Sequence, residues 1–240
     1  MAGHSKFKNI QYRKGAQDKK RAKLFAKISK EITVAAKLGL PDPNANPRLR
    51  SAISLARSQN MPKDNIERAI KKSDASDKTN YNSLVYEGFG PEKIAIIVEA
   101  LTDNKNRTVA EIRHLITKYG GNLGENGSVS WMFDKKGQIV ISKVGQNEDN
   151  LFEDSINAGA EDFDSDEDSF IVKTDPIEMM SIRTALEGNG YSIDSAKVEM
   201  LPKNLHKIEK NQSEKAMVLL DAIEDHEDIK SVYTNLDFED

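Results

Sequence analysis

Apolar residues follow a helical period near the N-terminus of this chain and an alternation of strand and helix patterns after it. The first helix is predicted from about residue 16 up to residue 39, because apolar residues recur on one face at 3.6-residue spacing: Leu24, Phe25, Ile28, Ile32 and Ala35. Asn46 and Pro47 are the residue types of a helix cap and first turn, and Pro62 opens a short third helix. Three helices with short links predict a small bundle, followed by a polar linker at 73–80.

Strand-like patterns begin after this linker and alternate with helical ones. Short apolar or alternating stretches predict strands at 94–101, 128–133, 138–142, 170–173, 196–200 and 229–234. Helices are predicted from the capping pair Thr108 and Glu111 to Gly120, at 148–158, from Asp175-Pro176 to Leu186, and from Ser213 onward. The connections have the length of strand–helix–strand units, which predicts sheets with helices on one face.

A predicted turn at 134–137 and a break at Pro202 bracket a block of strands and helices that could form a unit by itself. The predicted fold class is therefore α+β: an N-terminal three-helix domain followed by two ferredoxin-like α/β domains, the third inserted in the second. The predicted boundaries are 1–80 for the helical domain, 81–133 with 204–240 for the discontinuous domain, and 134–203 for the acidic insert.

Charge is distributed very unevenly along the chain. Residues 6–30 contain ten Lys or Arg against a single acid, Asp18, in a protein whose formal net charge is −4. Residues 1–80 carry 19 basic and 7 acidic side chains, whereas residues 81–240 carry 16 basic and 32 acidic ones. A core does not need charge, so a dense one-signed block indicates a polyanionic partner, and nucleic acid is the commonest.

The cations at 20, 23, 27 and 30 form a stripe near the face opposite the apolar residues of the first predicted helix. Phe7 and Tyr12 lie among the cations that precede it, as rings that can stack on bases, and Asn9 could contact a base edge. A solvated lysine-rich face is the alternative, but the single sign and the continuation from arm to helix favour binding. The candidate nucleic-acid-binding residues are Lys6, Lys8, Asn9, Arg13, Lys14, Lys19, Lys20, Arg21, Lys23 and Lys27.

Motifs of enzymes and metal proteins are missing from the sequence. There is no cysteine, and the four histidines have no metal-binding spacing. The glycine-rich run at 120–127 lacks the ending of a phosphate loop. The acidic run at 161–168 resembles a calcium loop only in part, since Glu167 and Lys173 stand where glycine and a bidentate glutamate are required, so it is predicted to be a solvated loop. We therefore predict a protein that is not an enzyme, without metal, cofactor or small-molecule substrate.

The predicted location is the cytoplasm, because the chain opens with no apolar signal core and no apolar run approaches the roughly 20 residues of a membrane span. Absence of cysteine is consistent with a reducing compartment. No membrane partner is expected.

Several long strings resemble the YebC/PmpR family over nearly the whole chain. They are AGHSKFKNIQYRKGAQDKKRAKLF at 2–25, NPRLRSAISLARSQNMPKDNIERAI at 46–70, YEGFGP at 86–91, EALTDNKNRTVAEIRH at 99–114 and KYGGNLGENGSVSWMF at 118–133. Phe7 stands where the family often has Trp and Tyr12 where it often has His, and both departures keep a ring.

The resemblance implies three domains, the third inserted in the second, and a cytoplasmic protein without cofactor. It implies a probable DNA-binding transcriptional regulator, with the basic residues of 6–30 on the nucleic acid. The family also includes the mitochondrial translational activator of cytochrome oxidase, and other members act in translation at proline-rich stalls. The alternative function is therefore a ribosome-associated translation factor that binds rRNA. A hydrolase using the carboxylates near Glu161 and a protein-interaction module are further hypotheses.

Overall fold

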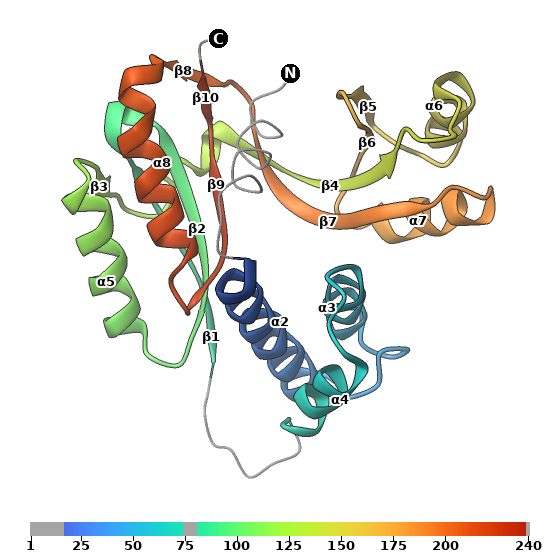
Figure 1. The fold of residues 1–240 in the computed structure, drawn as a ribbon, viewed down its shortest axis with the longest axis horizontal. Coiled ribbons are helices and arrows are strands. Elements are labelled where there is room, and N and C mark those ends of the chain that lie inside the picture. Colours follow the sequence, from blue (N-terminus) through green and yellow to red (C-terminus); the bar gives the residue numbers. More distant parts are fainter. Residues whose placement is uncertain (1–16, 74–80, 239–240) are drawn as a thin grey trace.

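The computed structural model describes residues 17–73 and 81–238, and shows a helical unit beside two sheet-containing units (Figure 1). The predicted α+β class, with helices first and sheets after, is confirmed. The predicted basic arm, and all but the first residue of the predicted linker at 73–80, lie outside the described residues.

The helical unit is built from α2 (Gln17–Leu38), α3 (Pro47–Ser58) and α4 (Lys63–Lys71), as predicted. Asn46 caps α3, because its side-chain oxygen accepts from the Leu49 amide at 3.1 Å. Its amide nitrogen donates to the carbonyls of Ala35 and Leu40, both at 2.8 Å, so one side chain ends α2 and starts α3. Ile32 and Leu49 are fully buried between the helices.

The first sheet has the order β3-β1-β2-β9, formed by Asn122–Leu123, Asn82–Phe89, Ala95–Thr102 and Ile229–Thr234, with every pair antiparallel. Helices α5 (Lys105–Lys118) and α8 (Lys210–Glu224) pack on one face, over an apolar core (Figure 1). Strands β8 (His206–Ile208) and β10 (Leu236–Phe238) form a parallel pair beside them.

The second sheet has the order β5-β6-β4-β7, formed by Asp162–Ser165, Ser169–Thr174, Phe133–Ser142 and Ile193–Pro202, again antiparallel. Helices α6 (Glu148–Asn157) and α7 (Met179–Gly188) pack against it. Its strands all fall between α5 and β8 in the sequence, so the chain leaves the first sheet and returns to it. The residue boundaries given above for the three domains stay predictions.

The sequence misplaced several strands. The predicted strand at 128–133 is a loop with a 3₁₀ turn at Ser130–Met132, and the predicted turn at 134–137 is the first half of β4. Strand β1 was not predicted at all. The long antiparallel ladder between β4 and β7 explains the second error, because pairing partners more than 50 residues away make a charged segment extended.

The acidic run at 161–168 was wrongly predicted to be a solvated loop. Its residues Asp162–Ser165 form β5, and the carboxylates of Asp162 and Asp164 both pair with Lys173 on the neighbouring strand β6. The lysine that disqualified the run as a calcium loop is therefore the partner of its acids.

Three helix starts also differ from the sequence prediction. Helix α5 is capped by Asn104, which accepts from the Arg107 amide at 3.1 Å, and Thr108 lies one turn inside the helix. Helix α7 begins at Met179 after a turn, and α8 begins at Lys210. Thr108 does not act as a cap. Its hydroxyl is buried and donates to Asp228 instead.

A buried carboxylate fixes the loop between the two sheets. Glu87 on β1 is 6% exposed and accepts from the backbone amides of Gly127, Val129 and Ser130 at 2.8–2.9 Å. Burial raises the pKa of Glu87, but these amide hydrogen bonds outweigh it and hold the pKa below its ordinary value. At the end of the loop the indole of Trp131 is left 67% exposed.

We expect Glu87→Gln to lower the free energy of unfolding by about 2 kcal/mol, because an amide cannot accept from all three buried donors. The carboxylate stabilises the fold above the unfolded pKa of about 4.3, and this contribution is lost as the pH falls through the lower folded pKa. Urea unfolding between pH 7 and 3 should therefore show a weaker acid destabilisation in the variant. Glu125→Gln, an exposed glutamate of the same loop, is the control, and equal losses in both variants would contradict the assignment.

Candidate nucleic-acid interface

The lysine stripe of α2 lies against the end of α8. Lys23, Lys27 and Lys30 are spaced by four and three residues, which puts their side chains on one face of the helix. Lys23 Nζ lies 3.0 Å from Asp225 Oδ2, and Lys27 Nζ donates to the backbone carbonyl of Glu224. These contacts join residues about 200 positions apart in the chain, and no sequence pattern indicated them.

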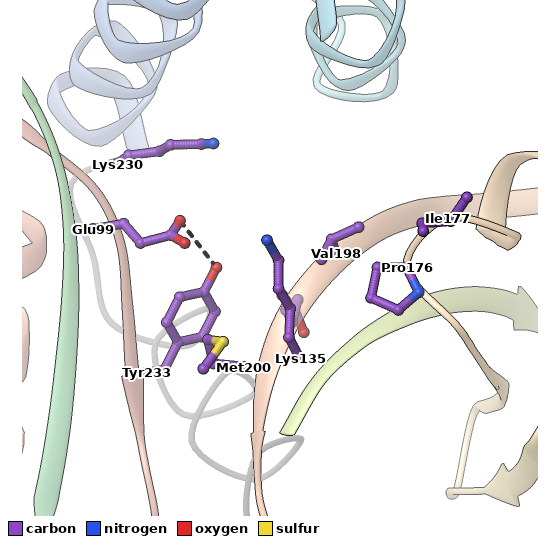
Figure 2. Close-up of a pocket in the computed structure, with 9 residues that line it drawn as sticks. Glu99, Lys135, Pro176, Ile177, Val198, Met200, Lys230 and Tyr233 are labelled. Atoms are coloured by element: carbon purple, nitrogen blue, oxygen red, sulfur yellow. Dashed lines mark hydrogen bonds between the residues drawn. The ribbon is translucent and has the colours of Figure 1, made fainter. Parts of the chain in front are cut away.

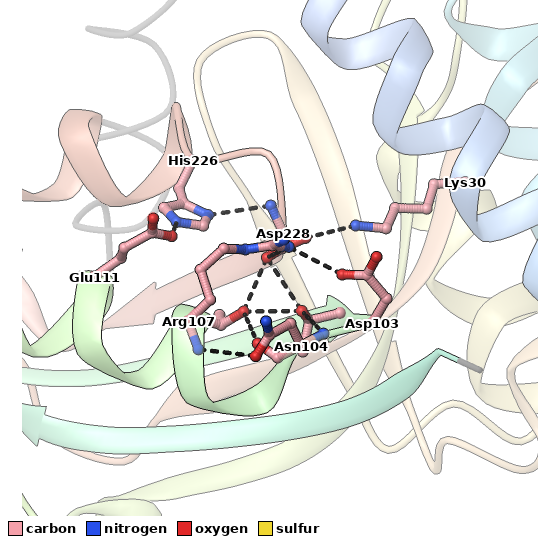
Figure 3. A network of polar contacts seen from close by, with 9 residues as sticks. Lys30, Asp103, Asn104, Arg107, Glu111, His226 and Asp228 are labelled. Carbon is pink, nitrogen blue, oxygen red and sulfur yellow. Dashed lines mark hydrogen bonds and ion pairs between the residues drawn. The ribbon is translucent and has the colours of Figure 1, made fainter. Parts of the chain in front are cut away.

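Lys30, the last lysine of the stripe, belongs to a buried network around Asp228 (Figure 3). The Asp228 carboxylate is 1% exposed, and it accepts from Lys30 Nζ at 2.7 Å and from Arg107 Nη2 at 2.8 Å. The hydroxyl of Thr108 donates to it at 2.8 Å and that of Thr102 at 3.1 Å. The network thus ties α2 to β2, α5 and the loop before β9.

Burial and ion pairing shift the pKa values of Asp228 and of the neighbouring Lys27. Burial raises the pKa of Asp228, but its bonds to Arg107, Lys30 and Thr108 outweigh burial and hold the pKa far below its usual range. Burial lowers the pKa of Lys27, and the nearby Glu224 and Asp225 only partly offset that effect. Asp228 is therefore a permanent anion at neutral pH.

His226 extends the network toward the surface (Figure 3). Its Nδ1 accepts from the Asp228 amide at 3.1 Å, and its Nε2 lies 2.7 Å from Glu111 Oε2 on α5. An accepting Nδ1 leaves the ring proton on Nε2, so the histidine donates to Glu111 and steadies the loop that carries Asp228.

The candidate residues predicted from the sequence divide into three groups. Lys6, Lys8, Asn9, Arg13 and Lys14 lie outside the described residues, as do the side chains of Lys19 and Lys20. Arg21 is exposed, and its guanidinium lies 5.3 Å from the ring centroid of Phe25. Lys23 and Lys27 lie together on one face of α2, but both contact oxygens of the protein, namely Asp225 Oδ2 and the Glu224 carbonyl.

Exposed cations of α3, α4 and the turn after them were not among the sequence candidates. They are Arg50, Arg57, Lys63, Arg68, Lys71 and Lys72. The signal that could have revealed them is the charge of this stretch, where only Asp64 and Glu67 are acidic between residues 47 and 72. They extend a basic surface across the helical unit.

A pocket of about 310 Å³ lies between the two sheets, with α2 and α3 above it (Figure 2). Its charged lining balances Lys135 and Lys230 against Glu99 and Glu199, and the phenol of Tyr233 lies 3.4 Å from Glu99 Oε2. Equal numbers of opposite charges give no preference for an anion, so this pocket adds nothing to a phosphate site.

Within residues 17–73 and 81–238, no three side chains of the metal-binding types gather as a metal site would require. No helix in the same part of the chain has the length and apolar character needed to cross a membrane.

Comparison with known proteins identifies the family. The model described as "TACO1/YebC protein N-terminal domain" matches residues 5–76, and "TACO1/YebC second and third domain" matches residues 81–236. This chain belongs to the TACO1/YebC family. The resemblance inferred from the sequence is confirmed.

Members of this family that are similar to the chain carry a regulatory name. A probable transcriptional regulatory protein of Geotalea uraniireducens is 51% identical, over 99% of this chain and 96% of that protein. One from Lacticaseibacillus paracasei is 48% identical over the full length of both. A conserved hypothetical protein of Aquifex aeolicus has a crystal structure that superposes with a TM-score of 0.84, at 40% identity and 95% coverage of each chain.

We expect Asp228→Asn to lower the free energy of unfolding by about 1.5–3 kcal/mol, because the neutral amide loses the charge-assisted bonds to Lys30 and Arg107. Asp103→Asn is the matched control, since Asp103 pairs with the same Arg107 at 3.0 Å but is 43% exposed. Urea unfolding at pH 7 should show a far smaller loss for the control. Comparable losses would mean that the buried pair does not hold the helical unit in place.

Proposed function

We propose that this protein is a nucleic-acid-binding regulator of gene expression and that its target is duplex DNA. The observation that carries the proposal is the charge of residues 6–30, where ten cations face a single acid. Relatives named as probable transcriptional regulatory proteins support a DNA target. Phosphates are the ligands that such a segment fits, through ammonium and guanidinium donors.

The helical unit supports the same proposal beyond that segment. Residues 17–73 hold 14 basic and 5 acidic side chains, and the exposed cations of α3 and α4 lie on the same unit as Arg21. Residues 81–240 carry a net charge of −16, which disfavours their approach to a phosphate backbone. The field of the molecule therefore favours binding with the helical unit toward the nucleic acid.

Ribosomal RNA offers the same phosphate chemistry, so the two targets differ in geometry and in their associated proteins. Cosedimentation with ribosomes at moderate salt, measured beside binding to duplex DNA, separates them. Retention on ribosomes with no measurable binding to duplex DNA would overturn the DNA proposal.

The salt dependence of binding gives a quantitative test. If five phosphates are neutralised, log affinity should fall with log salt at a slope of about −4.5 for duplex DNA and about −3.5 for a single strand. Neutralising four leading cations, Lys6, Lys8, Arg13 and Lys14, to glutamine should weaken binding and reduce the slope by up to about 0.9 per lost contact. Fluorescence anisotropy with a labelled duplex over 50–300 mM salt measures both quantities.

The control variant neutralises four exposed lysines outside the helical unit, Lys105, Lys118, Lys207 and Lys215. It removes the same charge and should leave the slope unchanged. A slope near zero for the wild type, or equal losses in the two quadruple variants, would contradict binding through the N-terminal segment.

A further inference from the structure

Two of the candidate phosphate-binding lysines are already held by oxygens of the protein itself. We call these oxygens the clasp, and define it as the backbone carbonyl of Glu224 with the carboxylates of Asp225 and Asp228. It binds Lys27, Lys23 and Lys30 respectively.

The clasp has the chemistry of a short stretch of nucleic-acid backbone. Its oxygens contact successive lysines along one helix face, as consecutive phosphates would. Glu224 is also the last residue of α8, where the aligned peptide dipoles leave partial negative charge on the terminal carbonyls. A lysine face packed against these groups cannot lie against a phosphate backbone at the same time.

The contacts of the clasp differ in strength along α2. At one end, the side chains of Lys23 and Asp225 are 51% and 57% exposed, so water and salt weaken their pairing. At the other end, Lys30 is 21% exposed and Asp228 only 1%, and this pair is shared with Arg107. A phosphate that competes for these lysines would therefore release Lys23 from Asp225 first. The Lys30–Asp228 contact would remain, and α2 could turn about it.

We propose that the clasp inhibits nucleic-acid binding by competing for Lys23 and Lys27. Phosphates displace the Asp225 carboxylate and the Glu224 carbonyl from these two lysines, while the Lys30–Asp228 contact stays closed. This inference rests on the proposed function, since it regulates the same basic surface. This role can be distinguished from a folding contact and from simple charge repulsion. Only under the clasp should removal of Asp225 strengthen nucleic-acid binding more than removal of a neighbouring acid.

Asp225→Asn tests the proposal, with Glu227→Gln as its matched control. Both residues are exposed carboxylates of the same loop, and both substitutions remove one negative charge. Asp225→Asn should tighten binding to labelled duplex DNA about two- to fivefold, the factor that one surface ion pair corresponds to. Glu227→Gln should bind like the wild type, and an equal gain in both variants would overturn the clasp.

A second arm repeats the Asp225→Asn substitution in a Lys23→Gln background. No gain is expected there, because the lysine for which the clasp competes is gone. A gain that persists without Lys23 would overturn the proposal. If the wild type binds DNA and Asp225→Asn matches Glu227→Gln, only the clasp fails, whereas absence of binding to DNA and RNA in every variant rejects the proposed function together with it.

Discussion

The carboxylate of Asp228 is the constraint on which the arrangement of this protein depends. It is 1% exposed, and a charge so placed is tolerated only when cations and hydrogen-bond donors surround it. One cation comes from α5 and the other, Lys30, from α2, so the helical unit completes a site that the first sheet leaves unfinished. Satisfying this carboxylate fixes α2 against the end of α8.

That placement has a consequence for the basic surface. Once Lys30 is anchored, the helical period carries Lys27 and Lys23 along the same face to the last carbonyl of α8 and to Asp225. Basic and acidic residues that lie far apart in the sequence therefore pair where α2 meets the end of α8. The net negative charge of residues 81–240 disfavours contact with a polyanion, and the clasp occupies two of the lysines that the sequence predicts to bind one.

Sequence patterns predicted the parts of the fold that local chemistry decides. The Asn46 cap and the apolar stripe of α2 act within a few residues, so α2 and α3 were placed well, whereas the starts of α5, α7 and α8 were not. The start of β4 at 134–137 and the acidic strand β5 were missed, because their extended form depends on partners such as β7 and Lys173. Likewise the pattern showed that α2 has a charged face, but its acceptors lie about 200 residues away.

The distance between α2 and α8 in the presence of nucleic acid tests the account most directly. The chain has no cysteine, so spin labels can be placed only at exposed Ala22→Cys on α2 and Lys215→Cys on α8. Pulsed electron-spin distance measurements should show one distance distribution for the free protein and a shift to longer distances at saturating duplex DNA, because phosphates replace Asp225 and the Glu224 carbonyl on Lys23 and Lys27. An unchanged distribution at saturation would contradict the account.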